Sequence, residues 1–248
     1  MKALSVKQPW ASVICSGIKD VENRTWQPGE APGRILIHAT SSKVERNFEG
    51  LPDDQVSTIK NARLFGQIPE YEDMPLGAII GYVDCYKIVK DSDSFWAQPQ
   101  SYHWCLRDAI LFDKPIYGVK GTRGRLFDFE LDENNLPPAH KVELSFPHLE
   151  DNCLKMPASE AVINAVKSGE KEIMYDLCET SFELFLDPNF GEPYQAERVE
   201  FMGTNETIIK EVEAIEVGQY LDLDGNPVEV NGYEGLEVYW SYVVLILK

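Results

Sequence analysis

"WASVICSGIKDVENRTW", residues Trp10 to Trp26, joins two different secondary-structure patterns across one glycine. Residues 9–16 carry apolar side chains at helical spacing, and Gly17 stands where a left-handed helix cap is common. Residues 20–26 then alternate in the manner of an extended chain. The side chains that share one face of that chain are Glu22, Arg24 and Trp26. The stretch predicts a short helix that ends at a glycine and leads into a strand.

The sequence around this stretch has further strand patterns. They are short runs of β-branched and aromatic residues between glycine- and proline-rich turns, at residues 34–38, 77–89, 102–106, 115–119 and 125–131. A helical pattern begins at Asp53. Several short strands with few helices predict an α+β fold, a small mixed β-barrel with short flanking helices.

The cysteines, histidines and apolar runs exclude several classes of protein. Five cysteines at scattered positions, never spaced as Cys-x-x-Cys, favour buried reduced thiols over a disulfide framework or a zinc site. The four histidines show no metal-ligand spacing, and residues 221–235 are better explained by a hairpin turn than by a calcium loop. We therefore expect no metal and no cofactor. Without an apolar run of roughly 20 residues or a signal-like start, the expectation is a cytoplasmic protein with no membrane partner.

Charge is divided unevenly along the 248 residues, whose formal net charge is −18. Residues 1–135 hold 16 basic and 19 acidic side chains, whereas residues 136–248 hold 7 and 22. Because an acidic surface repels polyanions, only the first half is suited to binding nucleic acid. The change coincides with the polar, proline-containing segment 132–141, so we predict domains at 1–135 and 142–248 with this segment as the linker.

The second half contains a weaker copy of the opening pattern. Ser168-Gly169-Glu-Lys171 repeats Ser16-Gly17-Ile-Lys19 after a helix-like stretch and before an extended one. In this alignment Met174 stands opposite Glu22, and Asp176 stands opposite Arg24. We interpret the halves as two tandem copies of one fold, of which the second keeps the frame and lacks the polar set.

These residues resemble the hallmark of the ASCH family, a branch of the PUA-like superfamily. The hallmark Gly-x-Lys-x-x-Glu-x-Arg is complete as Gly17-Ile-Lys19-Asp-Val-Glu22-Asn-Arg24, and "LSVKQPWASVI" before it is similar to the activating-signal cointegrator-like branch. The resemblance covers about residues 2–130, and a diverged ASCH-like domain would follow. It implies a barrel whose cleft presents the hallmark side chains to RNA or to a nucleobase.

The resemblance gives three polar residues a role in a pocket. Under it, Lys19 and Glu22 read the polar edge of a base, and Arg24 contacts a phosphate or a carbonyl group. The alternative is a purely structural ion cluster. A related small bacterial branch hydrolyses N4-acetylcytidine with Lys, Thr and Glu, but Glu22 occupies the position of its threonine.

Aromatic and amide side chains near the hallmark are candidates for ligand contact. The candidates are Gln8, Trp10, Trp26 and Trp104, and a stacked base is worth roughly 1–3 kcal/mol. The alternative for each tryptophan is burial in the core, and for Gln8 a place at the helix start.

A basic segment after the last strands of the first half offers a phosphate site. Its cations Lys120, Arg123 and Arg125 lie among Gly118, Gly121 and Gly124, where backbone amides could approach a phosphate. A flexible surface hairpin explains the composition equally well.

Two classes of function remain, with a third behind them. The preferred hypothesis is a module that binds RNA or a modified nucleobase, followed by an acidic domain that contacts a protein partner. The alternative is an amidohydrolase acting on an N4-acylated cytidine or a related nucleoside, with Lys19 and Glu22 as catalytic groups. A protein-interaction scaffold is the third hypothesis.

Overall fold

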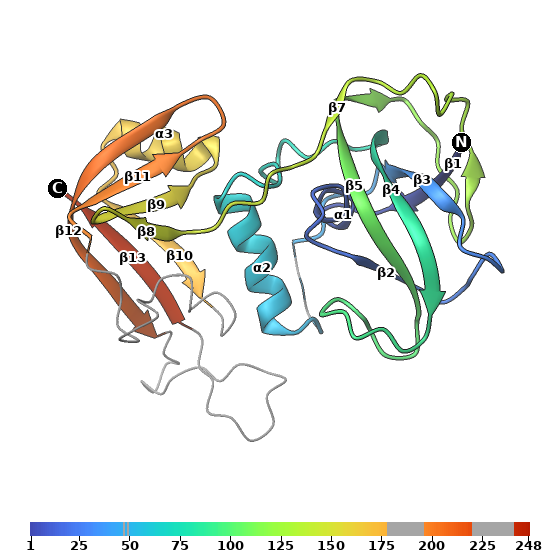
Figure 1. Ribbon diagram of the computed structural model, residues 1–248, viewed down its shortest axis with the longest axis horizontal. Helices are drawn as coiled ribbons and strands as arrows, with labels where there is room; N and C mark the ends of the chain where they lie inside the picture. Colours follow the sequence, from blue (N-terminus) through green and yellow to red (C-terminus); the bar gives the residue numbers. More distant parts are fainter. Residues whose placement is uncertain (47, 49, 178–195, 220–240) are drawn as a thin grey trace. The chain divides into compact units, whose positions relative to one another are not determined.

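The computed structural model describes the chain except for residues 47, 49, 178–195 and 220–240 (Figure 1). The described part is mostly β, with two sheets. The chain divides into two compact units, one formed by residues 1–47 and 68–144 and the other by residues 48–67 and 145–248. In the described ranges, no helix has the length and apolar character needed to span a membrane.

The first unit is built on a mixed sheet with the strand order β2-β5-β4-β3-β1-β6, and β7 pairs with β5. Strands β1 and β3 run parallel, and the other paired strands run antiparallel. The strands are β1 (Lys2–Val6), β2 (Val21–Arg24), β3 (Gly33–Ala39), β4 (Ala78–Val89), β5 (Tyr102–Tyr117), β6 (Phe127–Asp128) and β7 (Ala139–His140). Within the described residues the end strands β2 and β6 do not pair. The strand-rich sheet is compatible with the mixed β-barrel that we expected, but a closed barrel is not seen in this part of the chain.

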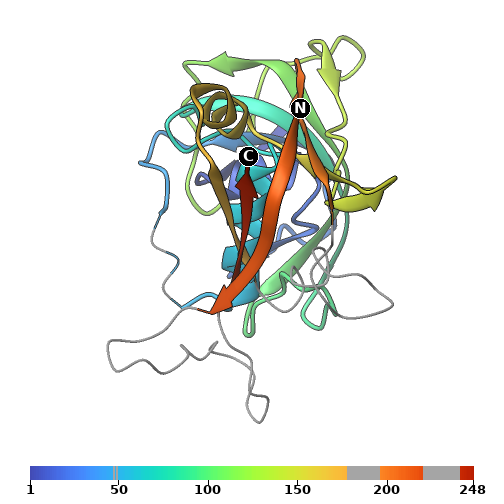
Figure 2. The ribbon, with the colours of Figure 1, turned by 90° about the vertical axis from the view of Figure 1, so that its left-hand side faces the viewer.

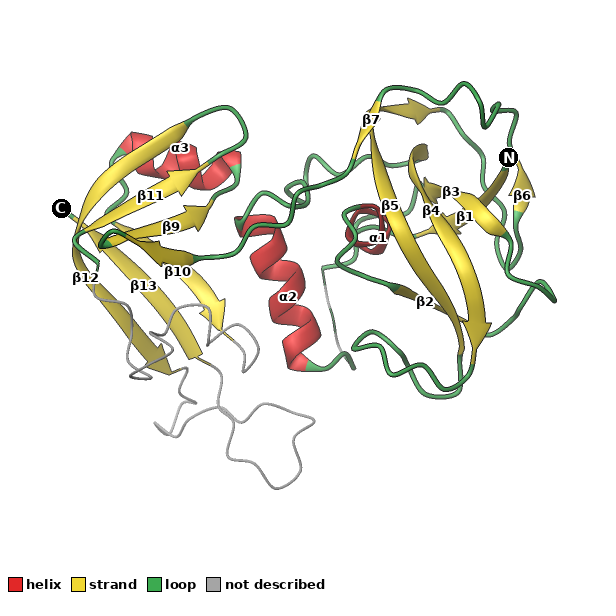
Figure 3. Cartoon of the chain, in the orientation of Figure 1, coloured by secondary structure: helices red, strands yellow, loops and turns green. Residues whose placement is uncertain are grey.

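Both faces of the first sheet are apolar. Ile35 and Ile37 of β3 pack into a cluster with helix α1 (Trp10–Cys15), and Leu36 between them packs into a separate cluster with Phe112. This follows from the alternation of side chains along a strand. Helix α1 lies within the curve of the sheet (Figure 3). The predicted helix and its glycine are confirmed, because Gly17 after α1 has a φ of 84°.

Strand β5 differs from the sequence prediction. We predicted two strands, at 102–106 and 115–119, but the chain is continuous from Tyr102 to Tyr117. Its pairing with β4 shifts register three times, and Asp108 adopts a left-handed φ of 50°. Such irregularities interrupt the apolar alternation without ending the strand, which is why the pattern alone indicated a gap.

The second unit has a six-stranded sheet with the order β10-β13-β12-β11-β9-β8. Its strands are β8 (His148–Glu150), β9 (Cys153–Pro157), β10 (Glu172–Leu177), β11 (Arg198–Met202), β12 (Thr207–Gln219) and β13 (Ser241–Leu247). Its helices are α2 (Asp53–Leu64) and α3 (Glu160–Ser168). Helix α3 lies beside the sheet (Figures 1 and 2), and Ser159 caps it by accepting a hydrogen bond from the amide of Val162.

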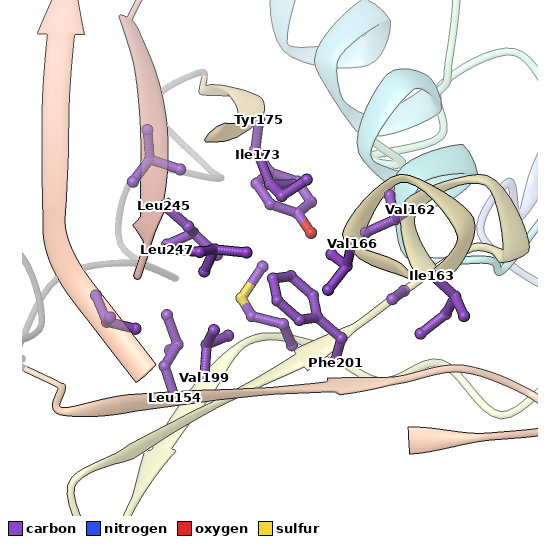
Figure 4. Close-up of a cluster of buried hydrophobic side chains, with 14 of the residues drawn as sticks. Leu154, Val162, Ile163, Val166, Ile173, Tyr175, Val199, Phe201, Leu245 and Leu247 are labelled. Carbon is purple, nitrogen blue, oxygen red and sulfur yellow. The ribbon is translucent and has the colours of Figure 1, made fainter. Parts of the chain in front are cut away.

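The core of the second unit is formed by apolar side chains that pack around the aromatic residues Tyr175 and Phe201. Val162 and Val166 of α3 point toward Phe201 of β11 and toward the strand residues Tyr175 and Leu245 (Figure 4). Burying side chains of this size contributes about 1.5–3 kcal/mol each, so this contact holds the helix on the sheet.

Element for element, the two sheets have the same topology. The series β9, α3, β10, β11, β12, β13 takes the places of β1, α1, β2, β3, β4, β5, with the same neighbours and the same directions of pairing. Two strands differ. The outermost strand β6 follows β5 in the chain whereas β8 precedes β9, and β7, which pairs with β5, has no counterpart among the described strands of the second sheet. That the halves are two copies of one domain stays a prediction, and the shared topology agrees with it.

The division into units differs from the predicted domains at two places. Residues 48–67 belong to the second unit, where the carbonyl of Leu64 accepts from the amide of Ser159 and Phe65 packs on Tyr175. Strand β7, inside the predicted linker 132–141, pairs with β5. Helical periodicity shows that a segment is a helix but not which sheet it joins. The hairpin predicted within 221–235 lies outside the described residues.

Candidate functional site

An open pocket of about 660 Å³ lies at one end of the first sheet. The carboxyl ends of β1, β3 and β5 meet at this edge, because β1 and β3 are parallel and β5 runs in their direction. Segments that follow these strands supply most of the wall, and α1 and β2 supply the rest. The lining residues include Ser5, Lys7, Trp10, Glu22, Arg24, His38, Thr40, Lys120, Gly121 and Arg123.

Three hallmark side chains form one ion network. Glu22 accepts from Lys19 Nζ at 3.0 Å through Oε2 and faces Arg24 Nη2 at 3.1 Å through Oε1. Lys19 also donates to the backbone carbonyl of Val21. The Lys19 side chain is only 5% exposed, whereas that of Arg24 is 20% exposed. Glu22 and Arg24 reach the pocket, but Lys19 is not among the residues that line it.

Arg24 is held in place while part of its guanidinium remains available. Its Nη2 donates to the carbonyl of Ser5 at 2.7 Å. Its Nε is buried and has no hydrogen-bond partner among the described residues, and the same is true of Thr40 Oγ1. Leaving a buried polar group unsatisfied costs about 1–3 kcal/mol. A ligand that accepts hydrogen bonds at this end of the pocket would remove that cost.

The predicted aromatic contacts separate into one pocket residue and two core residues. Trp10 lines the pocket, with its ring 5.9 Å from Lys19 Nζ. Trp104 is fully buried and packs edge-to-face on Trp26 at 4.9 Å, and neither residue lines the pocket. Burial in the core was the alternative to ligand contact that we gave for Trp104 from the sequence, and the structure shows this burial.

Gln8 also lies away from the pocket. The residue is fully buried, its Oε1 accepts from the amide of Ser12 at 3.0 Å, and its Nε2 donates to the carbonyl of Pro75 at 3.1 Å. With both ends of the amide engaged, Gln8 fixes the start of α1 against the segment before β4.

The basic segment after β5 contributes two cations to the pocket. Lys120 and Arg123 line it, whereas Arg125 is exposed and does not. The amide of Val119 donates to the carbonyl of Gly77 at 3.1 Å. This backbone bond ties the start of the segment to the sheet edge.

His38 holds the same segment from inside the pocket. Its Nε2 lies 3.0 Å from the carbonyl of Val119, so Nε2 carries the proton and donates, and Nδ1 accepts from Ser5 Oγ at 3.1 Å. Burial of the ring lowers the pKa of His38 below its usual value, which favours this neutral form. Gly121 packs so closely on Ser5 and on the His38 ring that a Cβ there would overlap both side chains.

The site candidates chosen from the sequence left out much of the polar lining, including Ser5, Lys7, His38 and Thr40. The signal that could have found them is positional. Ser5 and His38 are register partners near the ends of the parallel strands β1 and β3, and Lys7 and Thr40 follow just beyond them. Polar residues at the ends of adjacent parallel strands meet at one edge of a sheet. That inference needs the strand pairing, which a single sequence does not provide.

The cysteines that the structure describes lie outside the pocket. The four described cysteines are free and buried, and none of them lines the pocket. Burial raises the pKa of Cys85 to about 12 and that of Cys15 further. Since the thiolate is the reactive form, these thiols are inert at neutral pH.

Comparison with known proteins finds a similarity that covers part of this site, up to residue 116. Residues 4–116 match the model of the ASCH domain. A segment of 83 residues is 39% identical to human (Homo sapiens) Activating signal cointegrator 1 and covers 33% of this chain. It spans 13% of the length of that relative. The resemblance to the ASCH domain inferred from the sequence is therefore confirmed over residues 4–116, and this range includes Glu22 and Arg24, the hallmark residues that reach the pocket.

Proposed function

We propose that the first unit binds single-stranded RNA and takes one base into the pocket at the end of its sheet. The observation that carries this is the charge of the pocket. Four basic residues and one acidic residue line it, in a chain whose net charge is −18. A cationic cleft on an acidic protein attracts a polyanion to that cleft and away from the remaining surface.

The polar groups of the pocket suit the edge of a base. Glu22 offers carboxylate lone pairs to amino or imino hydrogens, and Arg24 Nε offers an unpaired donor to a carbonyl or ring nitrogen. Trp10 adds aromatic surface to the same wall. Sequence-specific RNA recognition uses such hydrogen bonds and stacking on unpaired bases. A modified base with an altered edge fits the same scheme.

The hydrolase alternative receives less support from the geometry. An attacking or polarising lysine must reach the substrate, but Lys19 is buried against Glu22 and the carbonyl of Val21 and does not line the pocket. Both carboxylate oxygens of Glu22 already face cations, Oε2 toward Lys19 and Oε1 toward Arg24. We therefore place binding ahead of N4-acylcytidine hydrolysis.

The acidic second unit is proposed to contact a protein partner and not RNA. Residues 136–248 hold 7 basic and 22 acidic side chains, so this part of the chain repels phosphates. An acidic surface of this kind is complementary in charge to a basic protein surface, so we propose a basic protein as the partner.

The test is binding of a fluorescein-labelled, single-stranded 12-nucleotide RNA of mixed sequence to the full chain, followed by anisotropy. We expect Arg24→Met to weaken binding by about 10-fold or more, since an arginine that contacts a base is worth about 1–3 kcal/mol. The matched control is Arg107→Met. It removes an exposed arginine of β5 that pairs with Asp84 of β4 and lies outside the pocket. Equal affinities for the two variants, or no binding by the unaltered protein, would refute the proposal.

A further inference from the structure

We infer that the wall formed by residues 119–124 is a phosphate subsite, so that the site selects a nucleoside joined to a phosphate over a bare nucleoside. The inference rests on the proposed function and specifies its ligand. It assigns the pocket two chemically distinct parts, a base-reading part at Glu22 and Arg24 and a phosphate-binding part at Lys120 and Arg123.

The first support is a set of cations without partners. Lys7, Lys120 and Arg123 line the pocket, and no salt bridge is formed by any of them with the described residues. Glu22, the single acidic lining residue, is already shared between Lys19 and Arg24. Three like charges around one cavity repel one another, and an anion with several acceptor oxygens is what such a cavity binds best.

The second support is the supply of neutral donors at the same wall. Thr40 Oγ1 is buried without a hydrogen-bond partner in the described part of the chain. Ser41 and Ser42 also line the pocket and carry hydroxyl groups, whereas the hydroxyl of Thr122 already donates to the carbonyl of Arg125. Hydroxyl groups and backbone amides make a large share of protein contacts to nucleic-acid phosphates.

The third support is that the segment is fixed. His38 holds the carbonyl of Val119, Gly77 accepts from the amide of Val119, and Gly121 packs on the His38 ring with no room for a side chain. A flexible surface hairpin would need none of these contacts. A backbone that is already held in place loses less freedom when the ligand binds, so the segment is suited to present its cations to an anion.

The closing experiment compares ligands that differ only in the phosphate. Calorimetry on the full chain measures the four ribonucleosides, their 5′- and 3′-monophosphates, and inorganic phosphate. We expect at least one monophosphate to bind about 10-fold more tightly than its nucleoside. The double variant Lys120→Ala/Arg123→Ala should remove that preference and leave nucleoside affinity unchanged. Arg125→Ala, an exposed arginine of the same segment outside the pocket, should retain the preference.

Two RNA probes distinguish the sources of the phosphate. A 12-nucleotide RNA with a 5′-phosphate and the same RNA without it are titrated at several salt concentrations. Tighter binding of the phosphorylated strand assigns the subsite to a terminal phosphate, and equal binding assigns it to an internal phosphodiester. In either case the double variant should flatten the salt dependence of log K by about 0.7 for each lost contact to the single strand.

The failures of the two proposals are distinguishable. If the RNA binds through Arg24 but nucleosides and monophosphates bind equally, and the double variant behaves like Arg125→Ala, the phosphate subsite is refuted while the RNA proposal stands. If neither the RNA nor any nucleotide binds the unaltered protein, the RNA proposal is refuted and the subsite with it.

Discussion

In the first unit, the strand after Gly17 carries Glu22 and Arg24 into a pocket, whereas in the second unit the strand after Gly169 carries Met174, which is 51% exposed. Both glycines have a left-handed backbone, with φ of 84° and 93°. Each follows the helix, α1 or α3, that connects corresponding strands of two sheets with the same strand order. Lys19 is buried in an ion network, but the corresponding Lys171 is exposed. The frame is thus shared and the polar network is not.

The strand register extends this comparison to the pocket floor. The spacing of 152 residues that relates Gly17 to Gly169 also relates Ser5 of β1 to Pro157 of β9. Ser5 pairs with His38, and Pro157 pairs with Met202. The second unit therefore has neither the hydroxyl nor the imidazole that hold the pocket wall in the first. Because the same topology forms without them, these polar residues serve the pocket and not the fold.

The largest effect on the free energy of unfolding is expected from exchanging Glu22 and Met174, the residues that differ between the two units. Glu22→Met gives the first unit the residue of the second and leaves buried Lys19 without its carboxylate. Breaking a buried ion pair in this way costs about 3–5 kcal/mol. Denaturant unfolding followed by tryptophan fluorescence reports the first unit selectively, because four of the five tryptophans lie within residues 1–47 and 68–144.

The reciprocal change provides the control. Met174→Glu introduces a carboxylate at an exposed position, where substitutions usually change stability by less than about 0.5 kcal/mol. If Glu22→Met lowered the free energy of unfolding no more than Met174→Glu does, the ion network would not stabilise the first unit. The proposed difference between the two units would then be wrong.

A smaller effect is expected from adding one methyl group at a close contact in each unit. Gly121→Ala places a Cβ against Ser5 and the His38 ring, and overpacking of this kind costs about 1–3 kcal/mol. We expect the segment 119–124 to move, which should reduce the preference for a monophosphate over its nucleoside. Calorimetry with the two ligands measures this ratio, which a general loss of stability would not change.

The matched change in the second unit is Gly203→Ala, whose Cβ would lie 2.9 Å from Ile163 Cγ1. We expect it to lower the stability of the second unit and to leave nucleotide affinity unaltered. Loss of the phosphate preference in this variant too would mean that the contact at Gly121 has no particular connection to the pocket.

Local patterns predicted those parts of the first unit that local physics determines. The helix before Gly17 and the strand after it follow from helical spacing, a left-handed glycine and alternation, and the structure confirms all three. The three hallmark side chains Lys19, Glu22 and Arg24 form an ion network, which was the alternative to ligand contact, and their contact with a ligand stays a prediction. These features depend on residues within a few positions of one another.

Features that depend on contacts between residues far apart in the chain were not predicted from the sequence. His38 looked like a strand residue, and only its pairing beside Ser5 and its reach to Val119, 81 positions away, make it part of the pocket. Helix α2 was correctly predicted as a helix from Asp53, but its membership of the second unit comes from contacts around Phe65 and Tyr175. Trp104 was a candidate for stacking on a ligand because it is a tryptophan near the hallmark. It is buried because strands β2 and β4 flank β5 on both sides.

The smallest expected effect is on the pH dependence of stability, and it belongs to the first unit alone. Burial holds the pKa of His38 below its usual value near 6.5, so the unfolded chain takes up a proton at a higher pH than the folded chain. The His38 contribution is therefore present above pH 6.5 and is lost as pH falls through the folded-state pKa. The corresponding residue of the second unit, Met202, does not titrate.

The measurement is urea unfolding at pH 5, 6 and 7, followed by tryptophan fluorescence, for the unaltered chain and for His38→Gln. We expect the unaltered chain to lose more stability than the variant between pH 7 and pH 5, by no more than about 1.4 kcal/mol per pH unit for one proton. Glutamine keeps an amide that can donate to the carbonyl of Val119, so the variant removes the titration while it retains the hold on the segment. Parallel pH profiles for the two proteins would mean that His38 titrates alike in the folded and unfolded chains. The other three histidines, His103, His140 and His148, are present in both proteins and cancel in the comparison.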